Sequence, residues 1–268
     1  PYMCQEQEVL QHEWNITNNP ELHIFNDYWN NRVSVFNIIE PHNELTIESK
    51  LVVRTIAPPD GYLKYSGTKT LLDQEMSDNL SLLELTAVDQ VDAQDIINEI
   101  TGAVYSLEKT IADQVQYCSE YIYNNFQYIK GITDIETTVD EILDHKSGVC
   151  QDFAHLMLSC LRSLGLPARY VSGYVLNDVL PGKKRLSGAD ASHAWVASHC
   201  PQLGWVAFDP TNGKLADLEF VTLGWGREFS DISPLSGVVL GGAMQELSVV
   251  VKVQPLEAGE SSDGNDAA

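Results

Sequence analysis

Cys150 combines a reactive side chain with a favourable position in the sequence. A wide apolar stripe from Val149 to Leu164 predicts a buried helix of about four turns, and Cys150 falls in its first turn, two residues after Gly148. The unpaired N–H groups and the partial positive charge of a helix N-terminus favour a thiolate, so Cys150 is a candidate nucleophile. The alternative is that Cys150 is a small buried apolar residue, as many free cysteines are. Cys160, on the apolar face of the same helix, is assigned to the core.

A thiolate nucleophile needs a base and a group that orients the base. Residues 192–211 predict a hairpin whose turn is centred near residue 201. This register places His193 opposite Asp209 on one face of adjacent strands, where the carboxylate could hold the imidazole. It also pairs Trp195 with Ala207 and Ala197 with Trp205. The alternative is a surface histidine and an aspartate that only begins a turn before Pro210.

Other segments have the apolar spacing of helices. Periodicity predicts one helix over residues 92–100 and a longer one over 107–125. Thr138, followed three residues later by Glu141, has the form of a capping box and predicts a short helix to about residue 144. Gly165, just after the cysteine-bearing helix, is typical of a helix C-terminus.

A two-residue period predicts strands on both sides of these helices. Residues 32–39 and 45–53 are expected to form an antiparallel hairpin with a turn at 41–43, and the prolines and glycine of 57–61 end this β region. After the central helix, a loop is expected over 177–190 and strands at 168–176, 194–198, 204–208 and 246–253.

The order of these elements predicts an α+β fold. The expected parts are an N-terminal β domain over residues 1–75, a core that contains the candidate nucleophile over 76–225, a C-terminal strand-containing extension over 226–254, and a disordered acidic tail over 255–268.

Composition limits what the protein can bind. The chain has 268 residues and a formal net charge of −22, and a surface of that sign repels nucleic-acid phosphates and anionic lipid headgroups. No run approaches the roughly 18 apolar residues of a membrane span. The five cysteines include no C-x-x-C pair, and no zinc, phosphate-loop or EF-hand pattern occurs. We therefore expect no metal or other cofactor and no binding to nucleic acid or membrane.

Four blocks around the candidate residues resemble the bacterial transglutaminase-like proteins, a group often named as cysteine proteases. In the family's order, the blocks are Gly-Val-Cys-Gln-Asp-Phe-Ala-His at 148–155, Leu-Pro-Ala-Arg-Tyr-Val-Ser-Gly-Tyr at 166–174, Ser-His-Ala-Trp at 192–195 and Gly-Trp-Val-Ala-Phe-Asp-Pro-Thr-Asn at 204–212. The resemblance implies a papain-like core, in which a helix bearing cysteine packs on an antiparallel sheet bearing histidine and aspartate. It also implies a β-sandwich-like N-terminal domain.

The resemblance maps a catalytic triad onto Cys150, His193 and Asp209. In the implied mechanism the cysteine sulfur attacks an amide carbonyl, the histidine protonates the leaving amine, and the aspartate fixes the histidine tautomer. Water releases the resulting thioester in a hydrolase, and an amine releases it in a protein-glutamine gamma-glutamyltransferase. We favour the amide or peptide hydrolase. The alternatives are cross-linking and a catalytically idle module that binds protein.

Several neighbours are candidates for the oxyanion site or the substrate cleft. The backbone N–H of Cys150 is one expected oxyanion donor, and Gln151 or Tyr128 could supply a second. Gln151 and Asp152 could line the cleft, or they could cap and solvate the helix. Trp195 could form a wall of the substrate groove or fill the core.

Partners and location are less constrained. We expect a protein or peptide substrate and leave the oligomeric state open. The basic residues 183–185 are either a contact for an acidic substrate or part of a solvated loop. The chain begins at Pro1, where the family usually has a further strand, and it has Arg-Glu-Phe at 227–229 where Arg-Asp-Tyr is usual. Because we expect the native start to be missing, cytoplasm is assigned by default.

Overall fold

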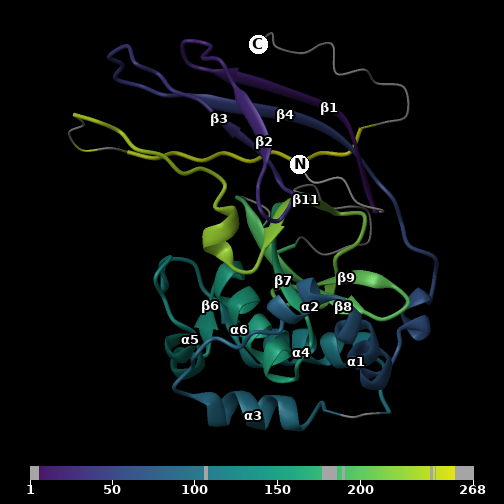
Figure 1. Ribbon diagram of the computed structural model, residues 1–268. Coiled ribbons are helices and arrows are strands. Elements are labelled where there is room, and N and C mark those ends of the chain that lie inside the picture. Colours follow the sequence, from purple (N-terminus) through teal and green to yellow (C-terminus); the bar gives the residue numbers. More distant parts are fainter. Residues whose placement is uncertain are drawn as a thin grey trace.

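The computed structural model describes residues 6–105, 108–176, 186–188, 191–241, 244 and 246–256. N-terminal strands lie at one end of the molecule and helices at the other, with a larger sheet between them (Figure 1). The N-terminal strands are β1 (Gln7–Ile16), β2 (His23–Asn26), β3 (Arg32–Val35) and β4 (Ile47–Thr55). The elements that follow are η1 (Tyr62–Tyr65), α1 (Lys69–Asp78), α2 (Leu80–Glu84), α3 (Gln94–Gly102), α4 (Ile111–Asn125), β5 (Gln127–Tyr128), α5 (Val139–His145), β6 (Ser147–Gly148), α6 (Cys150–Ser163), β7 (Ala168–Val175), β8 (His193–Cys200), β9 (Gly204–Asp209), β10 (Lys214–Leu215), β11 (Phe220–Gly226) and η2 (Phe229–Ile232).

The larger sheet is antiparallel, with strand order β10-β9-β8-β7-β11. Helix α6 packs against β7 and β8, and α4 packs against β8 and β9. Ala194 and Val196 of β8 belong to the cluster that also contains the buried residues of α6, whereas Trp195 and Ala197 belong to a second apolar cluster. Because side chains alternate along a strand, these two clusters occupy opposite faces of the sheet. Burial of a side chain such as Phe153 contributes roughly 1.5–3 kcal/mol and helps fix α6 on the sheet.

The predicted helices are confirmed as α3, α4, α5 and α6. The N–H of Thr138 donates to Glu141 Oε2 at 2.8 Å, and the N–H of Glu141 donates to Thr138 Oγ1 at 3.3 Å, so the capping box is present. Gly165 has φ +66°, the left-handed conformation that ends many helices. Helices α1 and α2 were not predicted, since each buries a single residue, Leu72 and Leu82, and neither has an apolar stripe. The expected boundary at residue 75 falls within α1.

The N-terminal strands pair differently from the prediction. β1 pairs with β4 and β2 pairs with β3, in both cases antiparallel. The predicted hairpin between residues 32–39 and 45–53 is therefore wrong, although parts of both segments are strands. Alternation of polar and apolar residues indicates that a segment is extended, but it does not name the partner strand. Here β4 pairs with β1 along almost its whole length.

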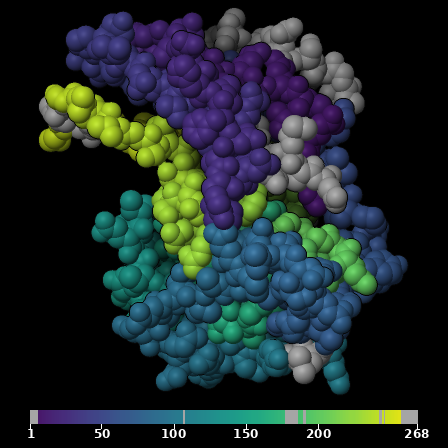
Figure 2. Space-filling view, in the orientation of Figure 1, coloured from purple at the N-terminus to yellow at the C-terminus, as the bar shows by residue number. Residues whose placement is uncertain are grey.

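Two side-chain amides join the N-terminal strands to β11, an edge strand of the larger sheet. Gln7 donates to the carbonyl of Thr222 at 2.9 Å and accepts from its N–H at 2.8 Å. Asn31 does the same with Trp225, at 2.7 and 2.9 Å. Each amide thus bonds the backbone as a neighbouring strand would. In Figure 2 the N-terminal segment forms a lobe above the helical part of the chain.

The hairpin of β8 and β9 is confirmed, but its register is shifted. Cys200 pairs with Gly204, so the turn is centred on residue 202 rather than 201. Trp205 therefore lies opposite His199, not Ala197, and Ala207 lies opposite Ala197, not Trp195. The same shift moves Asp209 from its predicted place directly opposite His193 to a diagonal one. The pairs assigned from the sequence are displaced by two residues because the turn is residues 201–203, with Gln202 at its centre and at φ +71°. An even displacement leaves each side chain on its expected face.

Two predictions near the C-terminus differ from the structure. β11, which pairs with β7, was not predicted, since its glycines, Gly224 and Gly226, interrupt the strand pattern. The expected strand at 246–253 is wrong. These residues have no regular secondary structure, and Leu247 and Val250 are 81% and 87% exposed. Of the eight residues, only Val251 and Val253 are half-buried, and the others are exposed.

Some expectations lie outside the described residues, namely residues 177–185 and 189–190 of the predicted loop, which include the basic residues 183–185, and the acidic tail from residue 257. Among the helices that the structure describes, none combines the length and the apolar character needed to cross a membrane.

Candidate active site

Cys150 is the first residue of α6, as the sequence predicts, and its thiol is free and half-buried. The helix N-terminus is held by Asp152, whose Oδ2 accepts the N–H of Val149 at 2.7 Å and the hydroxyl of Thr133 at 2.6 Å. N–H groups in the first turn of a helix have no partner within the helix. The backbone N–H of Cys150 is therefore available to a group bound beside its sulfur.

The approach to Cys150 is a short parallel ladder between β5 and β6. Tyr128 pairs with Gly148, and the carbonyl of Gly148 accepts the N–H of Ile129 at 2.9 Å. A Cβ at Gly148 would lie 2.6 Å from Asp152 Oδ2, so only glycine permits this approach of strand to helix. The ladder brings Tyr128, a predicted oxyanion candidate, beside the segment that leads into Cys150.

His193 and Asp209 are brought together at the edge of the β8–β9 hairpin. The imidazole Nε2 donates to Asp209 Oδ2 at 2.8 Å, and both side chains are fully buried. The carboxylate accepts two further bonds, from the Thr211 N–H to Oδ1 at 2.8 Å and from Asn212 Nδ2 to Oδ2 at 2.6 Å. These donors satisfy a charge that would otherwise be costly to bury.

The environment of His193 favours its protonated form. Burial alone would lower the pKa of His193, but the charge and hydrogen bond of Asp209, followed by those of Cys150, raise this pKa to about 10. Among the described residues, the other ring nitrogen, Nδ1, has no partner with regular hydrogen-bond geometry. Cys150 therefore acts on the charge of the ring, but its thiol does not meet Nδ1 in regular hydrogen-bond geometry. The three side chains can form a thiolate and imidazolium pair oriented by a carboxylate.

Three other cysteines and a second histidine–carboxylate pair show what distinguishes this site. Burial raises the pKa of the Cys118 and Cys200 thiols to about 12 and that of Cys160 well above its usual range. His199 Nε2 bonds Glu75 Oε2 at 2.7 Å, which makes a second histidine–carboxylate pair. The adjacent Cys200 points to the opposite face of β8, so this pair has no thiol beside it on the strand.

The remaining predicted site residues separate by burial. Gln151 is half-buried in the first turn of α6. Asp152 is buried, and its bonds give it a structural role at the helix N-terminus. Trp195 is 1% exposed and packs edge-on against Phe220 with ring centroids 5.2 Å apart, which places it in the core.

Sequence reasoning did not identify three residues beside the site. Asn212 bonds Asp209, and Gly188 lies against the His193 ring. The pKa of Tyr170 is raised first by burial and then by the charges of Cys150 and Asp152. Only the Asp-Pro-Thr-Asn order at 209–212 could have signalled the first, because an asparagine three residues after an aspartate can bond to it across a turn.

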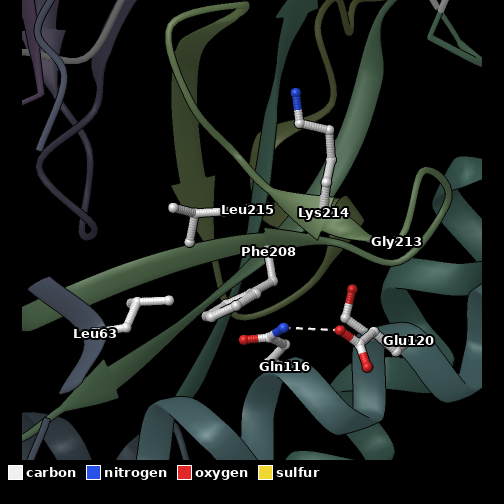
Figure 3. Close-up of a pocket in the computed structure, with 8 residues that line it drawn as sticks. Leu63, Gln116, Glu120, Phe208, Gly213, Lys214 and Leu215 are labelled. Atoms are coloured by element: carbon white, nitrogen blue, oxygen red, sulfur yellow. Dashed lines mark hydrogen bonds between the residues drawn. The ribbon is translucent and has the colours of Figure 1, made fainter. Parts of the chain in front are cut away.

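A separate cavity of about 170 Å³ lies between α4 and the β9–β10 turn (Figure 3). Among the described residues, the buried Ser119 Oγ has no hydrogen-bond partner, and Gln116 donates to Glu120 at 2.7 Å at the rim. The lining residues include no cysteine or histidine, so the cavity has no nucleophile of the kind found at Cys150. They are Leu63, Gln116, Ser119, Glu120, Phe208, Gly213, Lys214 and Leu215.

Comparison with known proteins gives matches in both parts of the chain. Residues 98–210 match the transglutaminase-like superfamily, and residues 1–54 match the bacterial transglutaminase-like N-terminal region. An uncharacterised protein of Mycobacterium tuberculosis (strain H37Rv) is 35% identical over 248 residues, which cover 86% of this chain and 76% of the relative. A protein-glutamine gamma-glutamyltransferase of Pseudomonas aeruginosa is 40% identical over 73 residues, which cover 27% of this chain and 11% of the relative.

A solved structure shares the fold. A crystal structure described as a "Putative Cysteine Protease" from Cytophaga hutchinsonii has a TM-score of 0.65 and 21% identity, and the match covers 86% of this chain and 75% of that chain. The likeness confirms the predicted mixed α and β fold, with a core of the kind that the sequence blocks implied.

Proposed function

The chain belongs to the transglutaminase-like superfamily, and we propose that it is a thiol-dependent amide or peptide hydrolase in which Cys150, His193 and Asp209 act together. One observation supports this assignment above all others. His193 is fully buried with Asp209, and its Nδ1 has no regular hydrogen-bond partner among the described residues. Cys150, the first residue of α6, is one of the groups that raise the pKa of His193. Nucleophilic catalysis by a thiol requires a nucleophile, a base and a group that orients the base, and these three side chains could supply them.

In the proposed reaction, the proton of Cys150 passes to Nδ1 of His193, and the sulfur attacks the carbonyl carbon of a bound amide. The tetrahedral intermediate collapses when the imidazolium gives its proton to the leaving amine, and a thioester on Cys150 remains. Water then attacks the thioester with His193 as base, which releases the acid and restores the thiol. Asp209 holds the ring throughout and stabilises its charged form.

The intermediate has a negatively charged oxygen that needs donors. The backbone N–H of Cys150 in the first turn of α6 is one, and the side chain of Tyr128 or Gln151 is the second in this proposal. An amide group fits a protein or peptide substrate, and this is the substrate class that we propose.

Protein cross-linking is the second candidate function. It is favoured by the 40% identity over 73 residues to the protein-glutamine gamma-glutamyltransferase of Pseudomonas aeruginosa. The thioester would be the same, and a primary amine would replace water in its release. The two functions therefore differ only in the second half of the reaction.

Product analysis separates these functions. The protein is incubated with a defined peptide mixture, with and without a primary amine, and the products are identified by mass. Cleaved or deamidated peptides support hydrolysis, and peptides that have gained the amine support cross-linking. Cys150→Ala should abolish either product, whereas Cys160→Ala, the matched control, should not. Peptide binding without any change of mass in the wild type would instead indicate an idle module.

A further inference from the structure

The side chain of Asn212 joins two segments of the active site. Its Nδ2 donates to Asp209 Oδ2 at 2.6 Å and to the carbonyl of Ser187 at 3.2 Å. Its Oδ1 accepts the N–H of Ser187 at 2.9 Å. A single amide therefore ties the carboxylate that holds His193 to backbone 25 residues earlier in the chain. These three bonds use both donors of the amide and its oxygen.

The segment that Asn212 holds lies directly against the imidazole. Gly188 has φ +86°, and a Cβ built on it would lie 2.3 Å from His193 Nδ1 and 2.8 Å from Cε1. Leu186 packs into the cluster of Trp195 and Phe220 on the same face of the sheet. Residues 186–188 thus form a wall against the ring, which we call the imidazole wall. It has Leu186 fixed by packing and Ser187 fixed by Asn212.

We propose that Asn212 is a positioning residue, which clamps the imidazole wall to Asp209 and so keeps Nδ1 of His193 directed at Cys150. The inference rests on the proposed function. His193 shares its face of β8 with Trp195, whereas α6 packs on the other face, so the ring must meet the thiol around the end of the strand. The wall touches the ring at Nδ1 and Cε1, so it restricts rotation of the ring about its bond to Asp209. A displacement of about 1 Å in such a constellation can slow a reaction roughly 100-fold.

Asn212 also influences the carboxylate itself. His193 and Asn212 donate to the same oxygen, Oδ2, while Oδ1 accepts the N–H of Thr211. In Asn212→Asp, two carboxylates would meet where the amide now donates, and such a pair takes up a proton more readily than either group alone. The protonated form regains a donor to Asp209. The defect of Asn212→Asp should therefore be repaired by acid, whereas that of Asn212→Ala should not.

The test measures the alkylation rate of Cys150 by iodoacetamide in the intact protein at about pH 7.5 and about pH 5.5. We expect Asn212→Ala to react roughly 10- to 100-fold more slowly than the wild type at both pH values. Asn212→Asp should be as slow at the higher pH and recover to within roughly threefold of the wild type at the lower one. Asn98→Ala, an exposed position on α3, is the matched control and should react as the wild type does.

Gly188→Ala tests the contact between the wall and the imidazole. The added methyl group would displace the ring and slow alkylation by a similar factor. Circular dichroism shows which variants are folded. Wild-type rates at both pH values in the folded Asn212 variants, or in folded Gly188→Ala if those do not fold, would overturn the inference. The proposed function would survive that result. If wild-type Cys150 reacts no faster than Cys160, the proposed function fails, and the inference fails with it.

Discussion

Replacing Asp209 by asparagine should remove a pH-dependent part of the protein's stability. Asn keeps the size of the side chain but not the charge, which is the largest of the effects that raise the pKa of His193. Burial, which lowers this pKa, is unchanged in the variant. The pKa of His193 in Asp209→Asn should therefore fall far below the value of about 10 in the wild type.

The magnitude follows from the difference in proton affinity between the folded and unfolded chains. With a pKa of about 10 in the folded state against 6.5 in the unfolded state, protonation of His193 stabilises the fold by about 5 kcal/mol below pH 6.5. Because the folded pKa is the higher one, this contribution declines as the pH rises. It is about 3 kcal/mol at pH 8 and less than about 1 kcal/mol at pH 10.

Urea unfolding at pH 6.5, 8 and 10, followed by tryptophan fluorescence, measures the difference. The gap in unfolding free energy between wild type and Asp209→Asn should shrink by about 4 kcal/mol between pH 6.5 and pH 10. The control is Glu75→Gln at the His199 pair, where the carboxylate is 40% exposed and the pair should contribute at most about 1 kcal/mol. A gap for Asp209→Asn that stays constant with pH would refute the argument that Asp209 stabilises a charged imidazole.

Three further outcomes test other parts of the structure. At pH 6, iodoacetamide should label Cys150 roughly tenfold or more faster than the buried Cys160, as peptide mass mapping can measure. Gly173→Ala should lower the melting temperature strongly, because the new carbon would lie 2.1 Å from a β11 carbonyl oxygen. Its control is Gly102→Ala, where the new carbon has no atom within 4 Å and the free energy of unfolding should change by less than about 1 kcal/mol. Gln7→Ala should speed hydrogen exchange in β11, and unchanged exchange there would contradict the docking role of this amide.

The parts of the site that local chemistry specifies were predictable from sequence. The apolar stripe and the glycine at residue 165 were enough to place Cys150 in the first turn of α6. Parity along two strands was enough to put His193 and Asp209 on one face, even though the turn was misjudged by one residue. That prediction held because an error of one residue in the turn centre displaces the register by two, and side chains alternate with a period of two.

Contacts between distant segments were not predictable in this way. The β1–β4 pairing and the docking of Gln7 on Thr222 depend on which edges meet in three dimensions, and a strand pattern does not contain that information. The proposed role of Asn212 depends on its hydrogen bonds to Ser187. The two residues are 25 positions apart, and local sequence patterns do not predict that they meet. Residues 246–253 show the converse, since they have the alternation of a strand but adopt no regular secondary structure.

The position of His193 as the first residue of β8 is the geometric requirement on which the proposed chemistry depends. Its side chain lies on the face of the sheet opposite to α6, and Cys150 begins α6, so the two can meet only where the strand starts. If the register of β8 slipped by one residue, the imidazole would lie on the face of the sheet that α6 covers. Asp209 would then remain buried without its histidine partner. His199 lies farther along β8 on the same face and also bonds a carboxylate, at 2.7 Å, but it lies away from the N-terminus of α6. A histidine–carboxylate pair is therefore not sufficient for this chemistry, because the pair must also lie at the end of the strand nearest the thiol.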